Sequence, residues 1–71
     1  MYLVSQDKMH LIKFEKVEVT GLFKTYSLMA YGTGPSVYAT VGTYETEELA
    51  KAELARIIAA LDSGQTIYEV R

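Results

Sequence analysis

The sequence predicts an α+β domain in which an antiparallel sheet of about five strands packs on one α-helix. Two observations lead to this prediction. Apolar residues recur at alternate positions through most of residues 1–44, where turn residues interrupt them, and a period of about 3.6 residues replaces the alternation in residues 45–64. The chain has 71 residues, fewer than the ~100–200 residues typical of one domain, so residues 1–71 are expected to form a single domain.

Four strands joined by short turns are expected before the helix, in the order 2–6, 10–20, 23–31 and 36–44. Asp7 and Lys8 form the tip of the first hairpin. A bulge or bend is expected at residues 14–16, where the alternation of faces slips. Gly21 ends the second strand, and residues 32–35 form the clearest turn of the chain.

Residues 45–64 predict an amphipathic helix. Thr46 is a good N-cap, acidic residues follow in the first turn, and Gly64 follows the last turn as a C′ glycine. The stripe expected to face the sheet contains Ala50, Leu54, Ile57 and Leu61. The acidic residues expected in solvent are Glu45, Glu47, Glu48 and Glu53. Alanines line the opposite side, where they reflect helix propensity or let another helix approach. A short final strand is expected at residues 66–70.

The expected connectivity brings three parts of the chain to one end of the sheet. In a meander, the tip at Asp7 and Lys8 lies at the same end as the turn at residues 32–35, and the helix returns to that end near Gly64. The final strand then runs antiparallel to the first strand and can pair with it.

One helix cannot cover a sheet of this width. The alternation places Tyr38 and Tyr44 on the face opposite to Val41, so the uncovered face is expected to present several tyrosines. Exposed area of this kind needs a partner, and a homo-oligomer is therefore expected.

The reactive groups predict that the chain is not an enzyme and holds no metal and no cofactor. It contains no cysteine, and His10 is its single histidine, so one chain cannot assemble a Cys/His zinc cluster. The serines lack a Gly-x-Ser-x-Gly context, and no acidic residue stands at a spacing that would orient His10 toward one of them.

Charge and hydropathy exclude two classes of partner. The net charge is −2, which disfavours duplex DNA because binding to its phosphate backbone needs a basic surplus. No uncharged stretch has the character of a membrane helix, and the first residues lack the basic and apolar regions of a signal peptide. A cytoplasmic protein that does not bind membranes is expected.

A ligand site is expected where the glycine turn meets the first hairpin tip. Glycine-rich backbone can offer N–H groups to an anion, and tyrosine rings can stack on a flat ligand. The residues assigned to this site are Lys8, His10, Tyr31, Thr33, Ser36 and Tyr38. For the tyrosines, packing in the core or in an interface is the alternative.

The two ends of the chain carry sequence features that resemble those of other short proteins. The chain opens with Met-Tyr-Leu-Val-Ser-Gln-Asp-Lys at residues 1–8 and closes with Val-Gly-Thr-Tyr at residues 41–44, the helix, Gly64 and a Tyr-Glu strand. In these features it resembles a group of short proteins of unassigned function from Gram-positive bacteria and their phages and mobile elements. The resemblance implies no catalytic residues. It implies a counter-defence role, such as binding a host signalling nucleotide or blocking a host protein.

Two functions follow as hypotheses. The first is a small non-enzymatic binding protein that sequesters a small anionic ligand, such as a signalling nucleotide, through the six residues named above. The alternative is a protein–protein interaction module, an inhibitor or adaptor of a host protein, that uses the open face of the sheet.

Overall fold

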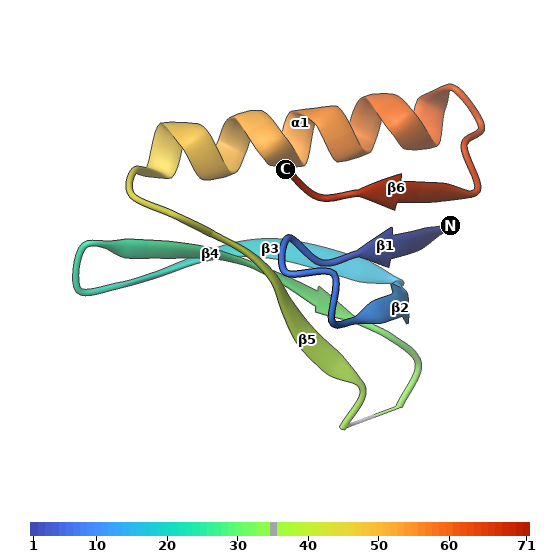
Figure 1. Ribbon diagram of the computed structural model, residues 1–71, viewed down its shortest axis with the longest axis horizontal. Coiled ribbons are helices and arrows are strands. Elements are labelled where there is room, and N and C mark those ends of the chain that lie inside the picture. The colour runs from blue at the N-terminus through green and yellow to red at the C-terminus, as the bar shows by residue number, and fades with distance from the viewer. Residues whose placement is uncertain (35) are drawn as a thin grey trace.

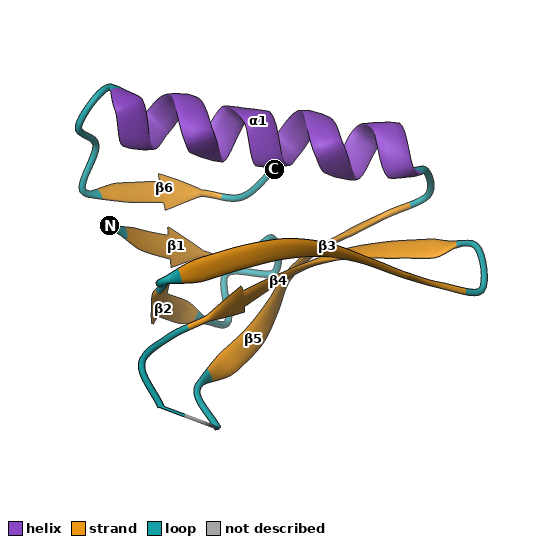
Figure 2. Ribbon diagram, turned by 180° about the vertical axis from the view of Figure 1, so that it is seen from behind, coloured by secondary structure: helices purple, strands orange, loops and turns teal. Residues whose placement is uncertain are grey.

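Figures 1 and 2 show the computed structural model of the chain, which describes residues 1–34 and 36–71. The described residues contain, in order, β1 (Tyr2–Val4), β2 (Leu11–Lys13), β3 (Lys16–Leu22), β4 (Thr25–Tyr31), β5 (Tyr38–Tyr44), α1 (Glu47–Asp62) and β6 (Ile67–Glu69). The chain is therefore α+β, as the sequence predicts. The helix α1 lies along one side of the molecule, above the strands in the view of Figure 1.

The strands form two three-stranded sheets, and the prediction of a single five-stranded sheet is wrong. One sheet has the order β2-β1-β6, and the other has the order β3-β4-β5. The expected bend at residues 14–16 is present, because β2 ends at Lys13 and β3 begins at Lys16. This bend carries the chain from one sheet to the other. A single alternating stretch of sequence is therefore two strands with different partners.

The last strand, β6, pairs with β1 in parallel, with Leu3 opposite Tyr68, whereas the sequence predicts an antiparallel strand. The N–H of Tyr2 donates a hydrogen bond to the carbonyl of Thr66 over 2.9 Å. The segment that follows α1 therefore arrives beside the start of β1, and β6 runs in the same direction as β1. Parallel neighbours need a crossover connection, and the chain that contains α1 supplies it.

The prediction that the hairpin tip meets the glycine turn is also wrong. The end of β4 lies opposite the start of β3, so residues 32–34 sit near the bend between the sheets. The turn that contains Asp7 and Lys8 lies at the other end of the β1–β2 hairpin. Pro35, which belongs to the predicted turn, lies outside the described residues.

The inner faces of both sheets and one side of α1 form a common hydrophobic core. Its buried members are Leu3, Ile12, Leu28, Ala30, Val41, Ile57 and Val70. Full burial of a large apolar side chain contributes ~1.5–3 kcal/mol relative to an exposed position. This core fixes the two sheets relative to each other. The faces that point away from it are the surfaces available for function.

The helix α1 begins and ends as predicted. The Thr46 hydroxyl oxygen accepts a hydrogen bond from the Leu49 N–H over 3.2 Å, and Gly64 follows the helix with a φ of 79°. The buried stripe differs from the prediction and consists of Ala50, Glu53, Ile57 and Ala60. Leu54 is half-buried and Leu61 is 47% exposed. The helix is therefore rotated about its axis relative to the predicted orientation.

A bulge at Val41 in β5 explains why Tyr44 faces the core. The ladder between β4 and β5 shifts by one residue at this point, and the Val41 carbonyl accepts a hydrogen bond from the Gln6 N–H over 2.8 Å. The extra residue reverses the alternation of faces, so the predicted outward position of Tyr44 is wrong. A Cβ at Gly42 would lie 2.5 Å from the Tyr44 hydroxyl oxygen, so a glycine leaves room for this side chain.

Candidate functional site

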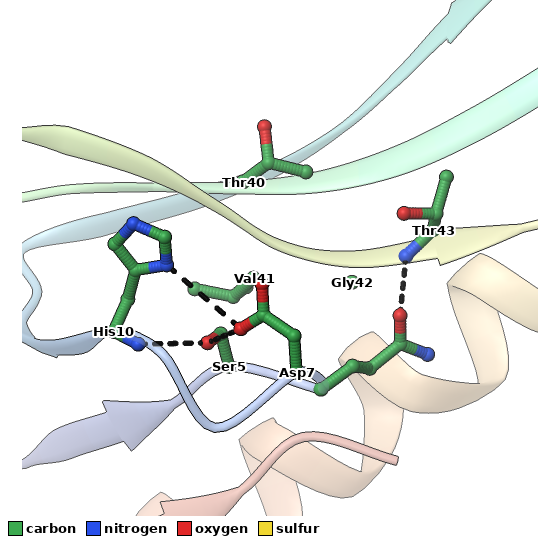
Figure 3. Close-up of a pocket in the computed structure, with 8 residues that line it drawn as sticks. Ser5, Asp7, His10, Thr40, Val41, Gly42 and Thr43 are labelled. Carbon is green, nitrogen blue, oxygen red and sulfur yellow. Dashed lines mark hydrogen bonds and ion pairs between the residues drawn. The ribbon is translucent and has the colours of Figure 1, made fainter.

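The turn between β1 and β2 places Ser5, Asp7 and His10 at a polar hollow of about 380 Å³, shown in Figure 3. The rest of the hollow is lined by Gln6, Thr40, Val41, Gly42 and Thr43. Asp7 Oδ1 accepts hydrogen bonds from the Ser5 hydroxyl over 2.5 Å and from the Met9 N–H over 2.9 Å. These two bonds, followed by the nearby His10, hold the pKa of Asp7 below its usual value.

Ser5, Asp7 and His10 have the residue types of a hydrolytic triad but a different arrangement. A triad needs histidine beside the serine hydroxyl, whereas here the Ser5 hydroxyl donates to Asp7, and His10 Nδ1 lies 3.9 Å from the same carboxylate oxygen. Ser5 is 2% exposed, and its oxygen accepts a hydrogen bond from the His10 N–H over 3.1 Å. The described contacts therefore stabilise the turn, and they place no imidazole nitrogen beside the Ser5 hydroxyl.

Lys8 and His10, two of the six predicted ligand-binding residues, belong to this turn. Lys8 Nζ lies 3.3 Å from Glu69 Oε1, and His10 faces Asp7. Both side chains are largely exposed. Each of these basic groups has a carboxylate beside it, which weakens its attraction for an anionic ligand.

Tyr31 and Tyr38, two further predicted residues, form a pair on the outer face of β4 and β5. Their ring centroids are 6.2 Å apart, and Lys16 Nζ lies 5.0 Å from the centroid of the Tyr31 ring. The Tyr31 hydroxyl donates to Glu18 Oε1 over 2.6 Å. This hydrogen bond raises the pKa of Tyr31 and lowers that of Glu18. The pair thus offers an aromatic surface with one cation and one carboxylate beside it.

Thr33 and Ser36, the last two predicted residues, lie in the turn between β4 and β5. The Thr33 hydroxyl donates to Glu15 Oε1 over 3.0 Å, and Ser36 is exposed. The structure therefore places four of the six predicted residues at one corner of the β3-β4-β5 sheet: Tyr31, Thr33, Ser36 and Tyr38. Lys8 and His10 lie apart from them, at the far end of the β1–β2 hairpin.

The outer face of the β2-β1-β6 sheet is an apolar surface that the prediction did not single out. Leu3 and Ile12 are buried, so their neighbours in the strands point outward. Four of these outward residues, which we call the apolar face, are Tyr2, Val4, Leu11 and Ile67. The signal is present in the sequence, because residues 2–4 are apolar at every position rather than at every second one.

A buried carboxylate lies between α1 and β6. Glu53 is 0% exposed, although the sequence predicts it in solvent. Its Oε1 accepts a hydrogen bond from Arg56 Nε over 2.6 Å. Its Oε2 accepts hydrogen bonds from the Tyr68 hydroxyl over 2.9 Å and from the Arg71 N–H over 2.8 Å. The position of Glu53 on the apolar stripe of the helix is the signal that could have revealed its burial.

The part of the chain that the structure describes contains no cluster of three or more His, Cys, Asp or Glu side chains able to hold a metal ion. Within residues 1–34 and 36–71, the helix is neither long nor apolar enough to cross a membrane. Comparisons with protein-family models, curated proteins and solved structures gave no match for this chain. A function for it therefore rests on its own geometry.

Proposed function

We propose that this chain is a non-enzymatic protein-interaction module that docks a partner protein through the apolar face. The observation that carries the proposal is the exposure of Tyr2 (43%), Leu11 (61%) and Ile67 (53%) on three adjacent strands. Their side chains point out of one face of the sheet, where Tyr2 pairs with Ile67 and Leu11 pairs with Val4. Contiguous exposed apolar residues of this kind mark interaction sites.

Charges border the apolar face. Lys13 is the ladder partner of Tyr2, and Glu69 is the ladder partner of Val4, so the two charges stand at opposite corners. A fitting partner has an apolar centre and an acidic group opposite Lys13, whereas Glu69 is already paired with Lys8. In the mobile-element setting that the resemblance implies, this partner is a host protein that the chain inhibits or recruits.

A second candidate function is the binding of a small anionic ligand such as a signalling nucleotide. It is supported by the Tyr31–Tyr38 pair with Lys16 beside it, because rings can stack on a base while a cation meets a phosphate. Glu15 and Glu18 accept hydrogen bonds at the same corner and repel an anion. Docking through the apolar face depends on apolar contact rather than on a free cation, so docking of a protein is the better supported function.

Photochemical cross-linking tests the docking function. A photoreactive phenylalanine analogue replaces Leu11 in one variant and Leu49 in a control variant. Leu49 is 52% exposed on α1, so the two positions have similar exposure on different surfaces. In host cells we expect a discrete adduct from position 11 and no matching adduct from position 49, because the partner covers the apolar face.

Purified components then show whether the adduct reflects specific binding. The double variant Leu11→Thr/Ile67→Thr keeps β-propensity and removes the apolar contact. We expect it to bind the captured protein about tenfold more weakly or worse, with little change in its melting temperature. Equal adducts from both positions, or unchanged affinity of the double variant, would rule out the apolar face. A thermal shift by a nucleotide that Tyr38→Ala abolishes would favour the second candidate.

A further inference from the structure

The outer edge of β3 carries main-chain groups that the β3-β4-β5 sheet leaves unused. A two-residue turn joins β3 to β4, so the hairpin closes on a hydrogen-bonded pair formed by Leu22 and Thr25. In an antiparallel ladder, hydrogen-bonded and non-hydrogen-bonded pairs alternate. Counting back from Leu22, every second residue of β3, starting with Gly21, therefore points its N–H and C=O away from β4. The residues with outward N–H and C=O groups are Val17, Val19 and Gly21. None of the described backbone contacts outside the ladders engages them.

Three features of β3 suit an edge strand that pairs with another chain, although Lys16 and Glu18 give it two charges. It has seven residues, contains no proline, and pairs with β4 without a register shift. It is the terminal strand of its sheet and runs along the front of the molecule in Figure 2. Val17 and Val19 are β-branched and suit an extended strand. An exposed edge of this length is a template for a further strand.

The helix adds an apolar flank beside this edge. One side of α1 contacts β6 through Glu53 and Tyr68. The strand β3 lies toward the other side of α1 in Figures 1 and 2. The flank of α1 opposite to Arg56 contains Leu54, Ile58 and Leu61. Leu54 packs against the core, whereas Ile58 is 57% exposed and Leu61 is 47% exposed. The free main-chain edge is thus bordered by apolar side chains.

We infer that β3 pairs in antiparallel with β3 of a second copy of this chain, so that two copies share one continuous sheet with both helices on the same face. A pairing centred on Val19 places Val17 opposite Gly21 of the second copy. Each outward N–H then meets an outward carbonyl, because these residues are the ones whose groups point away from β4. The two-fold symmetry also places the two apolar flanks on one side of the shared sheet.

The charges on β3 favour a second copy in this register. The pairing centred on Val19 sets Glu18 opposite Thr20 of the second copy, and Lys16 opposite Leu22, so like charges do not meet across the strands. A two-fold pairing centred on Glu18 instead would place two carboxylates against each other, which is destabilising. In the register centred on Val19, all seven residues of β3 lie opposite β3 of the second copy, so the edge is completely covered.

This dimer goes beyond the proposed docking function and does not depend on it. The apolar face lies on the other sheet and stays free, so each copy of the dimer would present one docking surface. Two linked docking surfaces raise the apparent affinity for a repeated or dimeric partner. Loss of the dimer leaves docking by one copy intact, and loss of docking leaves the dimer intact.

Sedimentation and light scattering of the purified chain test the inference. We expect a species of twice the 7.9 kDa chain mass at micromolar concentration. Val19→Pro removes an outward N–H that β3 does not use within one copy, and Ile58→Lys puts a charge on the apolar flank. Each is expected to raise the dimer dissociation constant about tenfold or more, equivalent to ~1.4 kcal/mol. Leu49→Lys, a matched change on another part of α1, should leave it unchanged.

The result that overturns the inference is a monomer at all micromolar concentrations, or a dimer whose dissociation constant neither Val19→Pro nor Ile58→Lys changes. Ile58→Lys keeps the test decisive if Val19→Pro fails to fold, since Ile58 is exposed in one copy. Amide exchange gives a second measurement. The Val19 N–H should exchange more slowly as the protein concentration rises, whereas concentration-independent exchange contradicts pairing through β3.

Discussion

The hydroxyl of Tyr68 donates a hydrogen bond to Glu53 Oε2 over 2.9 Å and joins β6 to the middle of α1. The same oxygen accepts the Arg71 N–H, and the other carboxylate oxygen accepts Arg56 Nε. A fully buried carboxylate is stable because such partners replace water. These contacts hold β6 against α1, and β6 supplies Ile67 to the apolar face.

Replacing Glu53 therefore weakens the attachment of β6. Glu53→Ala leaves the Tyr68 hydroxyl and the Arg71 N–H without their acceptor, and we expect the free energy of unfolding to fall by ~2–4 kcal/mol. Glu53→Gln keeps one acceptor oxygen and should cost less. Urea denaturation of the two variants measures both effects. If Glu53→Ala were as stable as the unmodified chain, the contacts of this carboxylate would not hold β6 in place.

The core side of α1 gives a second prediction. Ile57 is 1% exposed, whereas Leu54 is half-buried. Ile57→Ala should cost ~2–5 kcal/mol, Leu54→Ala should cost less, and Leu49→Ala on the exposed side should be close to neutral. Thermal melting of the three variants gives this order. The reverse order for Ile57 and Leu54 would restore the helix orientation that periodicity predicts.

The turn between β3 and β4 stores backbone strain. Phe23 and Lys24 have φ values of 53° and 52°, in the left-handed region that favours glycine and asparagine. Phe23 is 87% exposed, so its side chain adds little to the core. We expect Phe23→Asn with Lys24→Gly to stabilise the chain by ~1–2 kcal/mol, measured by urea denaturation. A loss of stability would show that the Phe23 ring has a folding role.

Burial raises the pKa of Tyr44 to about 12, and the charge of Glu53 adds to this effect. The folded chain therefore keeps the phenolic proton at pH values where the unfolded chain, with an ordinary pKa of 10.0, loses it. This contribution to stability is complete below pH 10 and is lost as the pH rises toward 12. Stability measured against pH should fall across this window, and Tyr44→Phe should make the fall less steep. An identical slope in Tyr44→Phe would assign the alkaline transition to other groups.

The sequence predicts the local elements well, but it does not predict which strands pair with one another. Capping by Thr46 and Gly64 depends on neighbouring residues, so the helix ends could be predicted. The parallel pairing of β6 could not, because alternation shows which face a strand buries and carries no information on its direction. The bulge at Val41 likewise adds one residue without a mark in the hydrophobic pattern, and Tyr44 changed faces as a result.

The candidate site divides in the same way. Tyr31 and Tyr38 meet because one turn joins their strands, and sequence proximity is enough to predict that. Lys8 and Thr33 do not meet, because their positions depend on the bend between the two sheets. The charge of Glu53 predicts a position in solvent, whereas the residue lies on the buried stripe of α1. A carboxylate can occupy such a position when Arg56 lies three residues away.

The docking function is tested most directly by nuclear magnetic resonance of the isotope-labelled chain. The purified protein that cross-linking identifies is added in a titration. We expect the methyl signals of Leu11 and Ile67 and the ring signals of Tyr2 to shift or broaden, while those of Tyr31 and Tyr38 stay in place. The contradicting result is a change confined to Tyr31, Tyr38 and their neighbours, with the signals of the apolar face unaltered at saturation.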